Sequence, residues 1–545
     1  MSAIVRSKGV MPSLQCERSA ILLCGLGLAL ATAVGAQGVG RDGEEFDLSG
    51  PRGGDQSVPQ IALGPTVGYV VWQDNGIDGP NNSFGIAARR FNPETGVWAP
   101  VFRANQTLAG PQENPQVALL RSGGAAFVWQ GGRLGSQDIY FRTHVPGKGF
   151  VPKTDLRVNT FTRGQQGTPV IACLTNGNLA VAWSSLHQDG HLQGIYGRVV
   201  APAGKFLSAA FRVNQFTGNN QRDPAITTLS NGNFVVVWIS ENQGVSTLET
   251  IRNTNRVHVY GRLFTKAGAA LGTEFRINTR SNLCAKPSVA PCGTQGFTVA
   301  WAEKSDNRED NWDIYARSFS APGATPSTDA LLLNSITYGD QLAPKIAQGG
   351  EHQLVVWSSL GHDGSREGVF GRALKAGQID GNEFRANTHT NSSQIHPCVV
   401  GNGRDRLWVG WSSFMGNSSF DVRGQRYDGA VASSEEPAIG FQAPSVAMEA
   451  SRLGGGGPPL PPTPLTPVIA PESNTTALRV SLANTSKGKR LSWNTEPGRT
   501  YQVQYSTNFT RWENLGEARP ATASSDSTLV GNGENAAVYR VVRLQ

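Results

Sequence analysis

The chain has 545 residues, too many for one ordinary hydrophobic core, so we expect several domains or an array of repeats. Charged residues make up 16%, below the ~25% typical of globular domains, and 65 glycines and 31 prolines favour a turn-rich, all-β chain. The net charge of +7 comes largely from arginines spread along the chain rather than from a basic cluster, which argues against a nucleic-acid partner.

Residues 1–36 are predicted to form a secretory signal peptide. Arg6, Lys8 and Arg18 precede the apolar run AILLCGLGLALATAVGA, which ends at Ala36 in small residues of the kind that signal peptidase cleaves. An uncleaved anchor is the alternative, but the run is short for a spanning helix, which needs ~20 apolar residues. We therefore expect an exported protein, in the periplasm, at the cell surface or outside the cell, with no membrane span after cleavage.

The predicted mature chain begins with an isolated phrase, DGEEFDLSG at Asp42–Gly50. Near-copies of it, GTEFRINTR at Gly272–Arg280 and DGNEFRANT at Asp380–Thr388, each stand at the end of a longer unit.

From Pro59 onward that unit recurs seven times. Each copy has a strand-like run beginning at a proline and then an apolar strand ending in tryptophan. The prolines are Pro59, Pro115, Pro169, Pro224, Pro287, Pro344 and Pro397, and the tryptophans are Trp72, Trp129, Trp183, Trp238, Trp301, Trp357 and Trp411. Turns such as SNGN at Ser230–Asn233 join the two runs, and Asn-Gly between apolar runs is a strong hairpin signal. A third run like GIYGR (Gly194–Arg198) and a fourth like AFRVN (Ala210–Asn214) follow.

Four short strands in each of seven units predict an all-β, seven-bladed β-propeller over residues 42–440. A series of β-sandwiches is a weaker alternative because one unit cannot close two sheets, and a β-helix would have shorter rungs. The first three runs occur seven times after Pro59, but the fourth occurs only six times. We expect Glu45–Ser49 to supply the missing strand and to close the ring, and we expect a monomer.

The succession PxVA, NGNFVVVW, QDG, GIYGRxF and EFRVNT resembles repeats of exported bacterial β-propeller proteins, and it spans about Glu44–Ala432. Most such proteins are uncharacterised, so the resemblance implies the fold and no activity.

Several residues recur in nearly every unit, and we interpret them as structural. Gln stands three residues before the blade proline, Arg ends the third run and Asn ends the fourth, as in Gln221, Arg198 and Asn214. Such repetition suits the satisfaction of backbone groups between blades, whereas a ligand site on a propeller is usually asymmetric. Cys284 and Cys292 fall at opposite ends of one predicted strand, too far apart for a disulfide, and we expect free cysteines.

The loops between the second and third runs are long and varied, which favours that face for ligand binding. The candidate ligand residues there are Asp74, Asp78, His187, Asp189, His191, Trp312, His362 and Asp363. Trp312 suits sugar stacking, while the alternative for the Asp-Gly pairs is that they simply form turns. No cofactor is expected. Asp306, Asp310 and Asp313 are the candidate calcium ligands, although no DxDxDG loop is present.

The sequence contains no GxSxG or HExxH motif, and we assign no catalytic residue. The favoured hypothesis is a non-enzymatic exported protein that presents the loop-rich face to a carbohydrate, a protein or another cell-surface ligand. The alternative is a carbohydrate-active hydrolase or lyase whose carboxylates converge at the propeller axis.

A Gly- and Pro-rich linker is predicted at residues 441–473, followed by a small β-sandwich at residues 474–545. The phrases LSWNTEPGRTYQVQYSTNFTRWENLG and YRVV resemble a fibronectin type III or immunoglobulin-like module. The resemblance implies a spacing, docking or binding role for this module.

Overall fold

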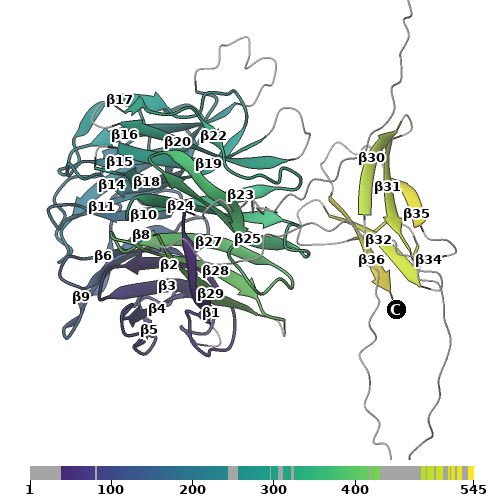
Figure 1. Ribbon diagram of the computed structural model, residues 1–545, viewed down its shortest axis with the longest axis horizontal. Helices are drawn as coiled ribbons and strands as arrows, with labels where there is room; N and C mark the ends of the chain where they lie inside the picture. Colours follow the sequence, from purple (N-terminus) through teal and green to yellow (C-terminus); the bar gives the residue numbers. More distant parts are fainter. Residues whose placement is uncertain are drawn as a thin grey trace, which may run out of the picture. The chain divides into compact units, whose positions relative to one another are not determined.

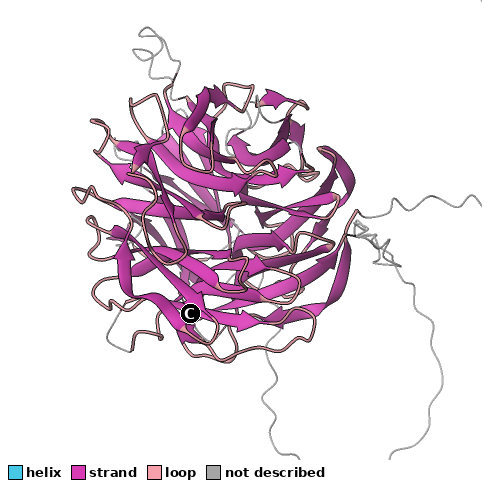
Figure 2. Cartoon of the chain, turned by 90° about the vertical axis from the view of Figure 1, so that its left-hand side faces the viewer, coloured by secondary structure: helices cyan, strands magenta, loops and turns pink. Residues whose placement is uncertain are grey.

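The structure is a computed structural model of the chain. It describes residues 38–429, except 80–82, 244–255, 295, 305–310, 321–323 and 417–418, and strand-forming segments between 480 and 544. These residues form strands and turns (Figure 2), and they include no helix long and apolar enough to cross a membrane. The chain divides into two compact units, Met1–Gly440 and Phe441–Gln545.

The first unit contains seven antiparallel sheets arranged as a β-propeller, as the repeat predicts (Figure 1). The first blade has β2 (Gln56–Leu63), β3 (Gly68–Asp74), β4 (Gly85–Phe91) and β5 (Phe102–Arg103), and the second has β6 (Gln112–Leu119), β7 (Ala125–Gly131), β8 (Asp138–Val145) and β9 (Gly149–Arg157). The third has β10 (Gln166–Cys173), β11 (Leu179–Leu186), β12 (Gln193–Val200) and β13 (Phe211–Arg212), and the fourth has β14 (Gln221–Thr228), β15 (Phe234–Glu241), β16 (Val257–Phe264) and β17 (Ala270–Arg276). The fifth has β18 (Cys284–Cys292), β19 (Gly296–Lys304), β20 (Trp312–Ser320), β21 (Thr325–Pro326) and β22 (Leu331–Leu332), and the sixth has β23 (Gln341–Gly349), β24 (His352–Leu360), β25 (Glu367–Lys375) and β26 (Gln378–Arg385).

The seventh blade takes its fourth strand from the other end of the chain. It contains β27 (Gln394–Gly401), β28 (Arg406–Phe414) and β29 (Phe420–Asp428), and β1 (Gly40–Asp47) pairs with β29 in antiparallel register. The predicted closure of the ring by the N-terminal strand is therefore confirmed.

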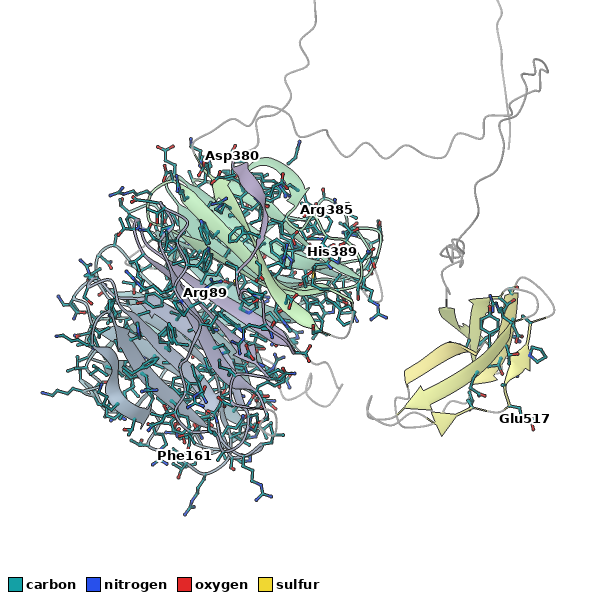
Figure 3. The ribbon with its side chains drawn as sticks, turned by 90° about the horizontal axis from the view of Figure 1, so that it is seen from below. Arg89, Phe161, Asp380, Arg385, His389 and Glu517 are labelled. Atoms are coloured by element: carbon teal, nitrogen blue, oxygen red, sulfur yellow. The ribbon has the colours of Figure 1, made fainter. Side chains whose placement is uncertain are left out.

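Glu45 on β1 fastens this strand to the sixth blade as well. Its carboxylate accepts hydrogen bonds from the backbone N–H of Thr388 at 2.8 Å and of His389 at 3.3 Å, and from Arg423 Nε at 3.1 Å. Arg41 on the same strand donates to the carbonyl of Arg385 at 3.0 Å. Figure 3 labels Arg385 and His389 on this neighbouring segment.

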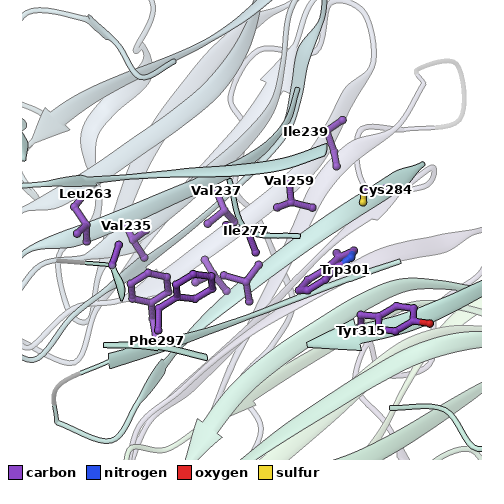
Figure 4. Close-up of a cluster of buried hydrophobic side chains, with 14 of the residues drawn as sticks. Val235, Val237, Ile239, Val259, Leu263, Ile277, Cys284, Phe297, Trp301 and Tyr315 are labelled. Carbon is purple, nitrogen blue, oxygen red and sulfur yellow. The ribbon is translucent and has the colours of Figure 1, made fainter. Parts of the chain in front are cut away.

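Seven clusters of buried apolar side chains hold the blades together, one between each pair of neighbours. Figure 4 shows the cluster between the fourth and fifth blades, where Val237 packs in the same core as Phe297 and Trp301. The cluster between the last blade and the first joins Leu48, Trp72 and Trp408, so packing also closes the ring. All seven repeat tryptophans have 0% exposure, which fits their predicted place in the core.

The recurrent polar residues satisfy backbone groups, as the structural interpretation predicts. Arg198 NH1 donates to the carbonyl of Val158 in the preceding blade at 2.8 Å. Asn214 Oδ1 accepts from the N–H of Ile195 at 2.7 Å, and Gln221 Nε2 donates to the carbonyl of Gly218 at 2.7 Å. Each bond gives a partner to a buried backbone group that would otherwise have none.

The four cysteines in the described residues are all free. Cys284 and Cys292 are the first and last residues of β18, which confirms that they do not form a disulfide. Cys284 occupies the position that other blades give to the recurrent Gln. Glu303 takes over the role of that Gln, since its Oε2 accepts from Trp301 Nε1 at 2.8 Å, as Gln112 Oε1 accepts from Trp129 Nε1 at 2.9 Å.

The second unit consists of two small sheets, in line with the predicted β-sandwich. One sheet contains β30 (Val480–Thr485), β31 (Gly488–Asn494) and β35 (Ser525–Val530), and the other contains β32 (Thr500–Ser506), β33 (Glu513–Asn514), β34 (Arg519–Pro520) and β36 (Val538–Leu544). Leu491, Tyr501 and Val503 form its buried core.

Candidate functional site

A β-bulge interrupts the first strand of every blade at the same point. In β2 the pairing with β3 shifts between Ser57 and Gln60, and the intervening Val58 has a φ of 53°. The residues equivalent to Val58, each directly before the blade proline, have φ between 48° and 54°: Asn114, Thr168, Asp223, Lys286, Ala343 and His396. This left-handed conformation costs a non-glycine residue about 1–3 kcal/mol, so the surrounding blades must impose it.

In the first three blades, the preceding blade stabilises the bulge through the side chain that follows its repeat tryptophan. Gln73 Oε1 accepts from the N–H of Asn114 at 2.9 Å, and Gln130 Oε1 accepts from the N–H of Thr168 at 2.8 Å. A backbone group freed by the bulge is thereby satisfied by the preceding blade, which fixes where the bulged residue points.

The seven bulge residues line a cavity of about 200 Å³, which we call the axial cavity. The residue after the proline adds a second layer of lining in several blades: Gln60, Gln116, Val170 and Lys345. Because every blade contributes one bulge residue, the cavity lies on the propeller axis. Its volume far exceeds the ~10–15 Å³ that one water needs and falls below the ~300 Å³ of the smaller drug-sized pockets, so it suits about one sugar unit.

The axial cavity lies toward the face that carries the long loops. Gln56, two residues before Val58, pairs with Asp74, and Gln394, two residues before His396, pairs with Ser413. Asp74 and Ser413 stand at the ends of the second strands, where the long loops begin. The cavity lining therefore lies nearer to the predicted ligand face than to the opposite face.

A chain of charges runs from the fourth blade into the axial cavity. Glu241 Oε1 accepts from Arg222 Nε at 2.9 Å, and Arg222 NH1 donates to Asp223 Oδ2 at 2.7 Å. Lys286 Nζ on the fifth blade donates to Asp223 Oδ1 at 2.9 Å. Burial alone would raise the pKa of Asp223, but the charges and hydrogen bonds of Lys286 and Arg222 outweigh it and lower that pKa. Asp223 is therefore ionised and held at both oxygens.

The sixth and seventh blades contribute a second amine and an imidazole. Burial, and then repulsion from Lys286, lowers the pKa of Lys345. Burial, and then the charges of Lys345 and Lys286, lowers the pKa of His396 below its usual 6.5. His396 is therefore neutral near pH 7. Its Nδ1 lies 3.4 Å from Ser412 Oγ.

Four of the predicted aspartates are bound to the recurrent asparagines. The shortest of these contacts are 3.0 Å for Asn105–Asp78, 3.3 Å for Asn214–Asp189, 2.7 Å for Asn334–Asp313 and 3.1 Å for Asn387–Asp363. Beside three of these aspartates, a glycine stands at or near the start of the third strand. A Cβ at Gly194 would meet Asp189 Oδ2 at 2.4 Å, and one at Gly368 would meet Asp363 Oδ2 at 2.8 Å. The aspartates of the Asp-Gly pairs thus have a structural use in these blades.

The other predicted ligand residues also have partners within the fold. Asp74 is buried and accepts from Trp72 Nε1 at 3.1 Å and from Arg52 Nε at 2.8 Å. His187 Nδ1 lies 2.6 Å from the carbonyl of His191.

His362 and Trp312 lie on different blades. His362 Nε2 lies 2.7 Å from the carbonyl of Tyr338, and Trp312 is half-buried against the cluster between the fifth and sixth blades. None of the eight predicted ligand residues lines the axial cavity, and ligand binding by them stays a prediction.

The weak calcium hypothesis falls mostly outside the described residues, since Asp306 and Asp310 are not among them. Within the part of the chain that the structure describes, no group of three His, Cys, Asp or Glu side chains could hold a metal ion.

Sequence reasoning missed Asp223, Lys286, Lys345 and His396. It compared the positions that repeat, whereas these residues occupy positions that vary within an otherwise repeated strand. The residue before the blade proline is Val, Asn, Thr, Asp, Lys, Ala and His in successive units, and that variety is the signal that could have found the site.

No protein-family model matches the chain, and neither does any curated protein. Solved structures do match. A protein of unknown function from Dyadobacter fermentans has a TM-score of 0.40 at 11% identity, covering 72% of this chain and 99% of that one. An ulvan lyase has a TM-score of 0.42 at 9% identity over 70% and 95%, and an α-L-arabinanase from Penicillium chrysogenum has 0.39 at 15% over 58% and 93%.

Most of the similar structures are carbohydrate-active enzymes, including arabinanases, an arabinofuranosidase and ulvan lyases. This finding contradicts the favoured expectation of a non-enzymatic binding protein and agrees better with the alternative. No residue role is carried over from any of these proteins at such low identity. The alternative also needs one correction, because Asp223 is the single carboxylate among the described residues that line the axial cavity.

Proposed function

We propose that this protein is a carbohydrate-active enzyme that cleaves a glycan in the axial cavity, as a hydrolase or a lyase. The observation that carries the proposal is the variety of the bulge residues. The recurrent Gln, Asn, Arg and Trp have structural uses, but a structural ring does not require Asp223, Lys286 and His396 at equivalent positions. Concave sites with a few convergent titratable groups are the usual places of catalysis.

The lining supports a sugar as the occupant. Amide and hydroxyl side chains come from the first three blades, namely Gln60, Asn114, Gln116 and Thr168, and the titratable groups come from the fourth to the seventh. Amides and hydroxyls both donate and accept hydrogen bonds, which suits the hydroxyl groups of a sugar.

His396 is the candidate general base. A neutral imidazole open to the cavity can take a proton from a water or from a carbon acid. Asp223 does not suit the role of general acid, because its two oxygens accept from Lys286 and Arg222. Hydrolysis by a pair of carboxylates would need a second acid in the cavity.

Cleavage of polysaccharides by residues 37–545 tests this proposal. Neutral and acidic polysaccharides are incubated with the protein, and new reducing ends are measured. His396→Asn keeps a residue that tolerates the left-handed backbone, and we expect it to lower kcat by about 100-fold or more. His352→Asn, at the first residue of β24 and outside the axial cavity, is the matched control and should keep full activity. Full activity in the His396→Asn variant, or no cleavage of any glycan, would overturn the proposal.

We also propose that residues 1–36 are removed on export and that the second unit is a fibronectin type III or immunoglobulin-like module for spacing or docking. The apolar run ending at Ala36 supports the first point, and the two-sheet arrangement supports the second. N-terminal sequencing of the exported protein should start at Gln37; a longer mature chain would contradict cleavage at this site.

A further inference from the structure

Lys345 has no direct counter-ion among the described residues. It lines the axial cavity from the position after the blade proline in β23. Among the described residues, none forms a hydrogen bond or ion pair with its ammonium group. Lys286 adds a second positive charge nearby, and Asp223, the carboxylate that favours the charged amine, is already bound by Arg222 and Lys286. A partly desolvated cation without a counter-ion is unfavourable for the folded state, so a ligand that supplies an anion gains from it.

The other charges near the cavity are already matched. The cavity region contains three cations, Arg222, Lys286 and Lys345, and two carboxylates, Asp223 and Glu241. Because His396 is neutral, one positive charge is left over. Asp223 and Glu241 are occupied by Arg222 and Lys286. The unmatched charge is therefore at Lys345, and Lys286, 57% exposed, has donors left for a ligand.

We propose that Lys345 and Lys286 bind the carboxylate of a uronic-acid unit, so that the glycan cleaved in the axial cavity is an acidic polysaccharide. This inference rests on the proposed function. Two ammonium groups on adjacent blades form charge-assisted hydrogen bonds to a carboxylate, and these are about twice as strong as neutral ones. A sulfate ester shares the charge, but it does not acidify a ring C–H bond, so only the carboxylate gives His396 a carbon acid to deprotonate.

The reaction that follows is elimination. In the tautomer whose Nδ1–H donates to Ser412 Oγ, His396 Nε2 has a free lone pair and takes the proton from the ring carbon that bears the carboxylate. The electron pair of that C–H bond forms a double bond to the neighbouring ring carbon. The bond from this second carbon to the glycosidic oxygen breaks, and the oxygen keeps the pair and takes up a proton from the imidazolium or from water. Nothing is oxidised or reduced, and the lysines stabilise the negative charge that builds on the carboxylate.

Four polymers and three variants test the proposal with residues 37–545. The polymers are polygalacturonate, its methyl ester, neutral arabinan and dextran sulfate. New reducing ends measure any cleavage, and ultraviolet absorbance of the conjugated double bond measures elimination. Binding of galacturonate and galactose is followed by calorimetry. The variants are Lys345→Met, Lys286→Met and the control Lys375→Met, whose side chain pairs with Glu351 at 2.9 Å at the turn opposite the long loops.

We expect unsaturated products from polygalacturonate only. Lys345→Met should raise KM and weaken galacturonate binding about tenfold or more, without lowering Tm, because it removes an unmatched charge. Lys375→Met should change neither. If arabinan is cleaved and its products contain no double bond, the uronate inference is overturned, while the proposed function as a glycan-cleaving enzyme stands. If galacturonate binds in a way that depends on Lys345 but no polymer is cleaved, the proposed anion site stands and the proposed enzymatic function is overturned. Preference for dextran sulfate, or no binding of either anion, would overturn the inference itself.

Discussion

His258 makes the stability of the propeller sensitive to acid. It lies in the fourth blade at the position that Asp138 and Asp313 occupy in theirs, and its Nδ1 lies 3.1 Å from Asn278 Nδ2. With 2% exposure it is buried, and burial, followed by the charges of Arg276 and Arg256, lowers its pKa from 6.5 to about 4. Protonation would also turn the acceptor of Asn278 into a donor.

The direction of the pH effect follows from linkage. The folded pKa lies below the unfolded one, so the unfolded chain binds more protons between pH 6.5 and about 4. The contribution of His258 is therefore complete above pH 6.5 and is lost as the pH falls toward 4. A shift of about 2.5 units corresponds to roughly 3 kcal/mol in all, of which about 2.5 kcal/mol is lost by pH 4.5.

His258→Asp gives the fourth blade the carboxylate that other blades use, and it removes this titration. Unfolding entropy of about 2.1 cal/mol/K per residue gives roughly 0.8 kcal/mol/K for the propeller, so the wild type should lose about 3 °C more in Tm than the variant between pH 7 and 4.5. Thermal melting followed by circular dichroism at the two pH values measures this difference. His187→Asn, at an exposed histidine, is the control and should melt like the wild type. An equal fall in Tm for the wild type and His258→Asp would refute the reasoning.

Three further predictions concern the ring, the loop aspartates and the buried thiol. Leu48→Ala should lower the free energy of unfolding by about 2–5 kcal/mol, because Leu48 is fully buried between the first and last blades. The control Val97→Ala, at 64% exposure, should change it by less than about 0.5 kcal/mol. Equal values for the two variants in urea unfolding would contradict closure by packing. Asp363→Ala should cost about 1–3 kcal/mol without any glycan present, because it removes the charged acceptor of Asn387 Nδ2 and leaves only the carbonyl of His389 and Gln394 Oε1. An unchanged urea midpoint would count against this structural role. Burial raises the pKa of Cys398 to about 12, so a thiol reagent at mildly alkaline pH should modify it only after unfolding, and rapid modification of the native protein would show that the thiol is accessible.

The repeat made most of the fold predictable, since each blade is specified by local signals. The proline at the start of the first strand, the Asn-Gly turns and the apolar strand ending in Trp183 or Trp238 are readable from single units. The place of the N-terminal strand was also predictable, because counting copies shows that the last unit lacks a fourth strand and that Glu45–Ser49 is left over.

The role of the loop aspartates needed the structure. From sequence, Asp189 and Asp363 could bind a ligand or form a turn, and both have carboxylates on the promising face. Only the fold shows that each accepts from a recurrent asparagine, Asn214 or Asn387, across about 25 residues of chain. Their pairing depends on the missing Cβ at Gly194 and Gly368, which is a matter of packing rather than of local sequence.

The sequence by itself determined seven blades, their tryptophan cores and the strand that closes the ring, because repeated local patterns specify strands and the count specifies closure. Only the tertiary structure decided where chemistry can occur. Asp223 and Lys286 are 63 residues apart and come within 2.9 Å because neighbouring blades bring their bulges to one axis. The bulge itself rests on a left-handed conformation that Val58 or His396 would not adopt alone, so it is imposed by blade packing and cannot be predicted from residue type.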